Sequence, residues 1–192
     1  VQAMNHAGVA FASCETDGRN FASVTLVLEQ LGQLRVRSAD WSGKAAPVLA
    51  TLRVASPDSD QLWMYRGADT ECVLSRIPSL EVEVWAEWGD GRVSRHGPLQ
   101  IQAGKTVEQV LVAQPAARLE IVHAGSEGWR SFEIWSATGA CMIRESFGPR
   151  QRRTWNLPEG EIRVVFPDAS QTAAAEFLTL RRETPTYLTV GG

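Results

Sequence analysis

The stretch Leu80-Glu81-Val82-Glu83-Val84-Trp85 decides the fold class, because apolar and charged residues alternate along it with a period of two. Successive side chains of a β-strand point to opposite faces, so this pattern predicts a strand with one face toward a core. The same alternation recurs in Leu34-Arg35-Val36-Arg37 and in Phe132-Glu133-Ile134-Trp135. Clusters of Gly, Pro, Ser and Asp separate such runs at spacings of roughly 8–12 residues, which is typical of an all-β sandwich.

The composition is that of an ordinary globular protein. The chain has 192 residues, of which 44% are hydrophobic and 21% charged, and its formal net charge is −3. Collagen, coiled-coil and disordered classes do not fit these values. No run of about 18 apolar residues occurs, so we expect no membrane insertion. The slightly acidic balance argues against binding of nucleic acid. The first residue is Val and no signal peptide is visible, so we interpret the chain as a piece of a longer protein.

The chain also repeats itself. Ile77-Pro78 and Leu157-Pro158 lie 80 residues apart, and an alternating run follows each of them. This offset predicts two copies of one unit, which are small Ig-like or prealbumin-like β-sandwiches at residues 32–114 and 115–192. Residues 1–31 are interpreted as the C-terminal strands of a preceding repeat. The junction at residues 115–117 is short, so the two copies are expected to lie close together, end to end.

Charges swap sign between the two copies. The opening run of the first copy carries Arg35 and the run after its Pro carries Glu81, whereas the second copy has Glu120 and Arg163 in these places. Opposite charges on adjacent strands stabilise a sheet. The swap therefore predicts that the opening strand and the strand after the Pro are neighbours in one sheet.

Two segments resemble a known family. Residues 26–36, LVLEQLGQLRV, resemble the junction between tandem carboxypeptidase-regulatory-like domains of bacterial surface proteins. Residues 153–164, RTWNLPEGEIRV, resemble the central F-x-x-LP-x-G signature of that family, and the corresponding residues 72–82 lack its Gly and Tyr. The resemblance implies seven-stranded transthyretin-like or Cna-B-like sandwiches, which act as spacers, stalks or binding modules. Some Cna-B domains form a Lys–Asn cross-link, but residues 115–192 contain no Lys, and we expect no such bond.

The sequence contains no arrangement of residues that indicates catalysis. No nucleotide-binding, zinc-protease or hydrolase motif occurs, and the three His lie in different repeats without a His or Cys nearby. His96 is expected in a solvated loop. Cys14, Cys72 and Cys141 form no CxxC pair, so we expect buried free thiols rather than a metal site. We therefore predict no enzyme activity, no cofactor and no metal.

Aromatic residues are the first candidates for ligand binding. By alternation Trp85 and Trp135 share faces with carboxylates and are expected to be exposed, while Trp63 and Tyr65 share a face with each other. Exposed aromatics beside carboxylates can stack on sugar rings, and exposed apolar patches can mark protein contacts. The alternative is that these side chains pack on the adjacent repeat or under Arg side chains.

Arg150, Arg152 and Arg153 form the basic cluster of the sequence, at the hairpin before Leu157-Pro158. Guanidinium groups bind carboxylate, phosphate and sulfate in a bidentate manner. The cluster is thus a candidate for an anion or an acidic partner, and a solvated hairpin tip is the alternative.

Together these observations predict a non-catalytic structural spacer or protein-interaction module from a larger exported or surface protein of a bacterium, with an extracellular or cell-surface location. Its partners would be protein or carbohydrate and the rest of its own chain. A carbohydrate-binding module that uses the exposed Trp and Tyr, or an accessory domain of an enzyme, are the alternatives.

Overall fold

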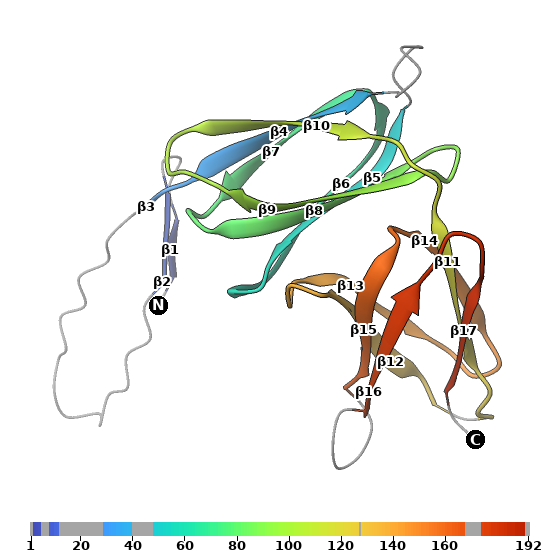
Figure 1. Cartoon of the computed structure of the whole chain (residues 1–192). Coiled ribbons are helices and arrows are strands. Elements are labelled where there is room, and N and C mark those ends of the chain that lie inside the picture. The colour runs from blue at the N-terminus through green and yellow to red at the C-terminus, as the bar shows by residue number, and fades with distance from the viewer. Residues whose placement is uncertain are drawn as a thin grey trace, which may run out of the picture.

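The computed structural model describes residues 2–4, 8–11, 29–39, 48–126, 128–167 and 174–190. Over these residues the chain consists of strands and turns and contains no helix (Figure 1). This confirms the predicted all-β class with tandem sandwiches. The strands are β1 (Gln2–Met4), β2 (Gly8–Phe11), β3 (Glu29–Gln30), β4 (Gly32–Ala39), β5 (Leu49–Ser56), β6 (Ser59–Asp69), β7 (Glu71–Ile77), β8 (Glu81–Trp88), β9 (Val93–Gln100), β10 (Thr106–Val112), β11 (Ala117–His123), β12 (Arg130–Ser136), β13 (Cys141–Phe147), β14 (Arg152–Leu157), β15 (Gly160–Phe166), β16 (Ala174–Leu180) and β17 (Thr186–Val190).

Strands β4 to β10 form the N-terminal sandwich. Its sheets have the orders β10-β4-β7 and β6-β5-β8-β9, and the first strand, β4, is parallel to the last, β10. The apolar residues of each alternating run lie between the two sheets, among them Leu34, Leu52, Val84 and Trp88, which are at most 1% exposed. Burial of these side chains holds the sheets together.

Strands β11 to β17 form the C-terminal sandwich with the same topology. Its sheets have the orders β14-β11-β17 and β13-β12-β15-β16, and β11 is parallel to β17. Each strand thus takes the place of the strand seven positions earlier in the chain. In the core, the Phe132 ring makes edge-to-face contacts with Phe147 and Trp155, at centroid distances of 5.4 and 4.9 Å. The repeated unit seen in the sequence is therefore a repeated sandwich.

Strands β1, β2 and β3 form a separate three-stranded sheet, in the order β1-β2-β3. Residues 24–28, which resemble a closing strand, lie outside the described residues. The interpretation of residues 1–31 as the end of a preceding repeat, and the boundaries at residues 32–114 and 115–192, stay predictions.

The predicted pairing of the opening strand with the strand after the Pro is wrong. β4 and β8 lie in different sheets, as do β11 and β15, because the chain crosses from one sheet to the other at Pro78 and Pro158. The neighbour of each opening strand is instead the strand before the Pro, β7 or β14.

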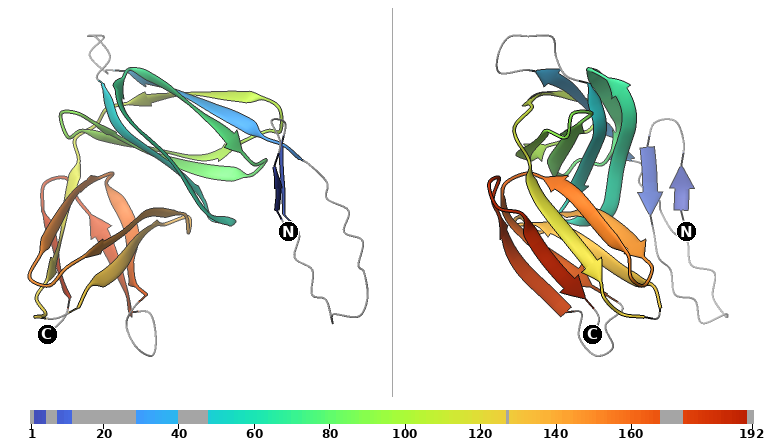
Figure 2. Two further views of the ribbon diagram at one scale, coloured as in Figure 1. Left: turned by 180° about the vertical axis from the view of Figure 1, so that it is seen from behind. Right: turned by 90° about the vertical axis from the view of Figure 1, so that its right-hand side faces the viewer.

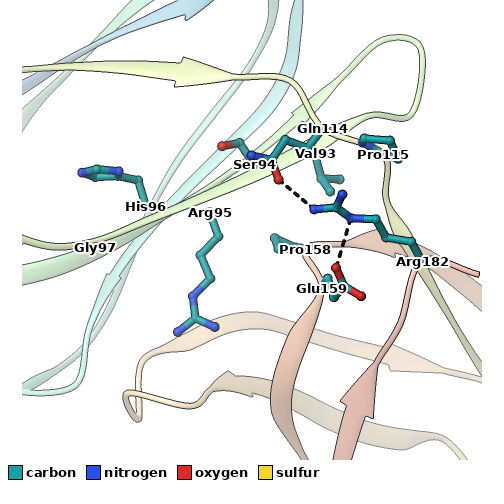
Figure 3. A pocket seen from close by; sticks show the side chains of 10 residues that line it. All are labelled: Val93, Ser94, Arg95, His96, Gly97, Gln114, Pro115, Pro158, Glu159 and Arg182. Atoms are coloured by element: carbon teal, nitrogen blue, oxygen red, sulfur yellow. Dashed lines mark hydrogen bonds and ion pairs between the residues drawn. The ribbon is translucent and has the colours of Figure 1, made fainter. Parts of the chain in front are cut away.

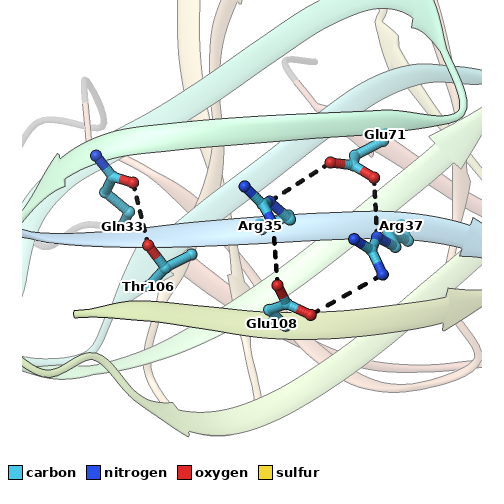
Figure 4. A network of polar contacts seen from close by, with 6 residues as sticks. All are labelled: Gln33, Arg35, Arg37, Glu71, Thr106 and Glu108. Carbon is cyan, nitrogen blue, oxygen red and sulfur yellow. Dashed lines mark hydrogen bonds and ion pairs between the residues drawn. The ribbon is translucent and has the colours of Figure 1, made fainter.

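The charges of the opening strands are nevertheless matched by these other neighbours. Arg35 and Arg37 on β4 form ion pairs with Glu71 on β7 and Glu108 on β10, at distances of 2.8–4.0 Å (Figure 4). The hydrogen bond from Arg37 to Glu71 raises the pKa of the Arg37 guanidinium. Opposite charges therefore do lie on adjacent strands, on the outer face of the sheet β10-β4-β7.

His96 lies within strand β9 rather than in the expected loop, and its side chain is exposed. The neighbouring Gly97 adopts a φ of 151°, and a Cβ added there would lie 3.1 Å from the Cα of Glu83. Only glycine fits this conformation and this approach. Gly97 thus lets β9 stay close to the middle of β8.

The C-terminal sandwich lies with one of its loop ends against the outer face of the sheet β6-β5-β8-β9 (Figures 1 and 2). The turn between β12 and β13 reaches the turn between β5 and β6, where a Cβ on Gly139 would lie 3.7 Å from Pro57. Arg144 on β13 donates to the backbone oxygen of Asp60, at 3.1 Å. The contact is thus between an end and a face, rather than between two ends as the short junction predicts.

Truncation of Phe132 to Ala should lower the free energy of unfolding by about 3–5 kcal/mol, because it leaves a cavity beneath two aromatic rings. Urea denaturation followed by Trp fluorescence measures this change. Phe177, which is 78% exposed, provides the matched control. Phe177→Ala should cost less than about 0.5 kcal/mol, and equal losses in the two variants would contradict the core described above.

Candidate functional site

The contact between the two sandwiches is built around the buried carboxylate of Glu83, which is 2% exposed. Within the N-terminal sandwich, the Trp85 indole N–H donates to Oε1 and the Arg95 Nε forms an ion pair with it, both at 2.6 Å. From the C-terminal sandwich, the Thr138 hydroxyl donates to Oε2 at 2.5 Å. Both oxygens of this buried charge are therefore satisfied, one of them by the other sandwich.

Apolar contact surrounds this carboxylate. Ala55 and Trp85, on the outer face of β5 and β8, belong to the same hydrophobic cluster as Ala140 and Met142 of the C-terminal sandwich. Arg53, beside them on β5, is 9% exposed, and its burial lowers the pKa of its guanidinium against the opposing effect of Glu87. Water is therefore excluded from the middle of the contact.

This arrangement corrects the expectation that Trp85 is exposed. The indole does point away from its own core, as alternation predicts, but the second sandwich covers it and leaves it 2% exposed. Trp85 therefore packs on the adjacent repeat, which is the alternative that the sequence left open. A burial pattern of period two cannot show which outward faces a second unit will cover.

A groove of about 450 Å³ runs along one side of this contact (Figure 3). Two arginines line it and both form ion pairs: Arg95 with the buried Glu83 at 2.6 Å, and Arg182 with Glu159, which also lines the groove, at 3.2 Å. Arg182 also donates to the side-chain oxygen of Gln114, at 2.9 Å. The bond between Arg182 and Gln114 ties the chain between the sandwiches to the C-terminal sandwich.

The other three aromatic candidates lie in different places. Trp63 is 8% exposed in the N-terminal core, and Tyr65 packs against that core while its hydroxyl bonds to Asp69, which raises the pKa of Tyr65. Trp135 is partly buried on the C-terminal sandwich, with Arg163 stacked 5.1 Å above its ring. The four aromatics therefore form no common platform. Their role in ligand binding stays a prediction.

The arginine candidates do lie together. Arg150 is in the turn between β13 and β14, Arg152 and Arg153 begin β14, and all three are exposed. Arg152 forms an ion pair of 3.2 Å with Glu120, which is 4% exposed. As with the aromatics, ligand binding by these residues stays a prediction.

Sequence reasoning missed three aromatics with exposed side chains: Trp129 is 68% exposed, Phe177 78% and Tyr187 65%. Trp129 follows a turn and belongs to no alternating run, and only its place next to Gly128 in a turn cluster could have indicated exposure. Phe177 lies on β16 opposite Arg163, the residue that covers Trp135.

Among the described residues the two histidines lie in different sandwiches, His96 exposed on β9 and His123 buried on β11. His123 is 1% exposed, with Nδ1 3.1 Å from the backbone oxygen of Gly148. Among the described residues no group of three or more His, Cys, Asp and Glu side chains could hold a metal ion, and no helix is long and apolar enough to span a membrane. Cys72 and Cys141 are buried free thiols, as predicted, and Cys14 lies outside the described residues.

No family model matches the chain, and no curated protein matches it. Pilins and other bacterial proteins are among the solved structures with some similarity. The Bacillus anthracis TIE protein shares 14% identity at a TM-score of 0.36, over 95% of this chain and 40% of that one. The minor pilin GBS52 of Streptococcus agalactiae shares 10% identity at a TM-score of 0.33, over 83% of this chain and 94% of the pilin. A putative carbohydrate binding protein from Bacteroides uniformis shares 9% identity at a TM-score of 0.35, over 78% of this chain and 96% of that protein. The β-sandwich assignment therefore rests on the sheets described above, and membership of the carboxypeptidase-regulatory-like family stays a prediction.

Replacement of Thr138 by Val should lower the free energy of unfolding by about 1.5–3 kcal/mol, because the shape is kept while a hydrogen bond to a buried charge is lost. Chemical denaturation measures the loss. Thr179, exposed on β16, is the control position, and Thr179→Val should be nearly neutral. If Thr138→Val were equally neutral, the hydroxyl would not contribute to the contact.

The two buried thiols should resist modification in the folded protein. Burial raises the pKa of the Cys72 thiol to about 11 and also raises the pKa of Cys141, so the reactive thiolate is scarce at pH 8. In a Cys14→Ser variant, a colorimetric thiol reagent should label neither residue at pH 8 until denaturant is added. Rapid labelling without denaturant would show that these sites are open to solvent.

Proposed function

We propose that this chain is a rigid, non-catalytic spacer of two sandwiches within a larger exported or surface protein of a bacterium. The observation that supports this function is the Glu83 contact, in which a buried carboxylate of one sandwich takes a hydrogen bond from the other. The proposed cell-surface location and bacterial origin rest on the resemblance found in the sequence.

Apolar burial and a buried hydrogen bond have different effects at this contact. Burial of Trp85 and Ala55 against the C-terminal cluster favours the docked arrangement over a separated one. The carboxylate then selects one orientation, because a rotated sandwich would leave Oε2 of Glu83 buried without the Thr138 hydroxyl. Apolar contact holds the sandwiches together, and the polar bond fixes their angle.

The linker adds to the rigidity. Val93 and Gln114 exchange two backbone hydrogen bonds, of 2.8 and 2.9 Å, so the chain stays fixed to the N-terminal sandwich up to Gln114. Strand β11 begins at Ala117. Only Pro115 and Ala116 remain between the two sandwiches, and the Pro ring restricts the backbone further.

The proposal that the chain is non-catalytic is supported by the pairing of the charged side chains at the contact. Glu83, Arg95, Glu159 and Arg182 each engage another protein group through an ion pair. A general acid or base needs a reacting group within hydrogen-bond reach, and these side chains are instead committed to bonds within the protein.

Nuclear magnetic relaxation of backbone amides tests rigidity. The two sandwiches should report one common rotational correlation time in the native chain. The double variant Trp85→Ala with Thr138→Val removes the indole and the hydroxyl from the contact, and the correlation times of its two sandwiches should differ more than those of the native chain while each sandwich stays folded. Separate tumbling in the native chain would overturn the spacer proposal.

A further inference from the structure

The end of the C-terminal sandwich away from Glu83 carries exposed aromatic and basic side chains. We call it the distal end and define it by Trp129, Arg130, Arg150 and Arg153. β12 runs from Arg130 toward the turn that contains Thr138, and β14 runs from Arg152 toward Pro158. The residues that begin these strands therefore lie opposite the contact between the sandwiches.

Strand register brings the distal end together from three separate segments. Arg130 is paired with Phe147, and this is the outermost pair of β12 and β13, which Trp129 precedes and Gly148 follows in the chain. The backbone N–H of Gly148 donates to the side chain of Gln151 at 3.1 Å, and the N–H of His123 donates to the backbone oxygen of Gln151 at 2.9 Å. These bonds fix the turn that carries Arg150 against the end of β11.

Arg130 and Arg153 approach the distal end from the two opposed sheets. Arg130 has the same strand parity as the buried Phe132 and Ile134, and Arg153 has the parity of the buried Trp155 and Leu157. Both side chains therefore continue the inner faces of the sandwich at the point where its core ends, which directs two guanidinium groups toward one region.

The pairing of these arginines can be followed among the described residues. Arg152 is paired with Glu120, but within the part of the chain that the structure describes no ion pair forms to Arg130, Arg150 or Arg153. Guanidinium groups that hold no carboxylate of their own are free to bind an anion, and their forked geometry suits carboxylate and sulfate.

Trp129 adds a flat apolar surface to this set of charges. Its side chain is 68% exposed, in contrast to Trp85 and Trp155, which are at most 8% exposed. An exposed indole can stack on the apolar face of a sugar ring. We propose that the distal end binds an acidic polysaccharide, with Trp129 stacked on a sugar unit and Arg150 and Arg153 on its carboxylate or sulfate groups. This goes beyond the spacer function, which needs no ligand.

The test uses the whole chain and three polymers: polygalacturonate oligosaccharides, dextran sulfate and neutral dextran. Isothermal titration calorimetry should detect binding of at least one acidic polymer and none of neutral dextran. Arg150→Glu with Arg153→Glu should weaken that binding by at least about tenfold, the scale of lost charge-assisted hydrogen bonds. Because ionic contacts at an exposed site are screened, affinity should also fall as salt is raised.

A matched control distinguishes an effect of the distal end from an effect of the net charge of the protein. Arg66→Glu with Arg181→Glu makes the same change of charge at exposed positions outside the distal end, and it should leave affinity within about twofold. Trp129→Ala should weaken binding severalfold and remove the fluorescence change that ligand causes. Equal losses in the two charge variants, no effect of Trp129→Ala, equal affinity for duplex DNA, or no binding of either acidic polymer would each overturn the proposal. Thermal unfolding of every variant confirms that these surface changes leave the fold intact.

Discussion

A buried carboxylate sets the arrangement of this protein. Taking the charge of Glu83 out of water is costly unless every oxygen finds a donor. Trp85 and Arg95 supply two donors from the same sheet, and Thr138 supplies the third from the other sandwich. The relative orientation of the two sandwiches is therefore coupled to the hydrogen bonding of one side chain, and the apolar contact around it provides the driving force.

The two sandwiches share one topology but use the same sheet face differently. In each, a Trp on the outer face of the four-stranded sheet donates its indole N–H to a Glu two residues earlier: Trp85 to Glu83 at 2.6 Å and Trp135 to Glu133 at 2.9 Å. In the N-terminal sandwich the second sandwich covers this pair. In the C-terminal sandwich Arg163 stacks on the Trp instead. The same local bond thus occurs on two strands that are not counterparts, β8 and β12, and the other sandwich covers the one on β8.

In both three-stranded sheets the charged residues of the central strand are paired with opposite charges, but the sign on the central strand differs between the two sandwiches. The central strand β4 carries arginines flanked by Glu71 and Glu108. The central strand β11 carries Glu120, which is held by Arg118 and Arg152. Both satisfy the preference for opposite charges on adjacent positions of a sheet, so either sign is compatible with the topology. The distal arginines stand outside this rule, because the described residues hold no carboxylate against Arg150 or Arg153.

The sequence by itself determined the strands, the repeat and the inner faces, because alternation with a period of two is a local property that each run carries. Leu34, Val84 and Ile134 are buried where that pattern places them. It could not determine which strands are neighbours, since the crossing at each Pro is a choice between two sheets. Nor could it show that the second sandwich covers Trp85 or that the Trp129 side chain is exposed. Those facts depend on contacts between segments distant in the chain, which only the packed structure decided.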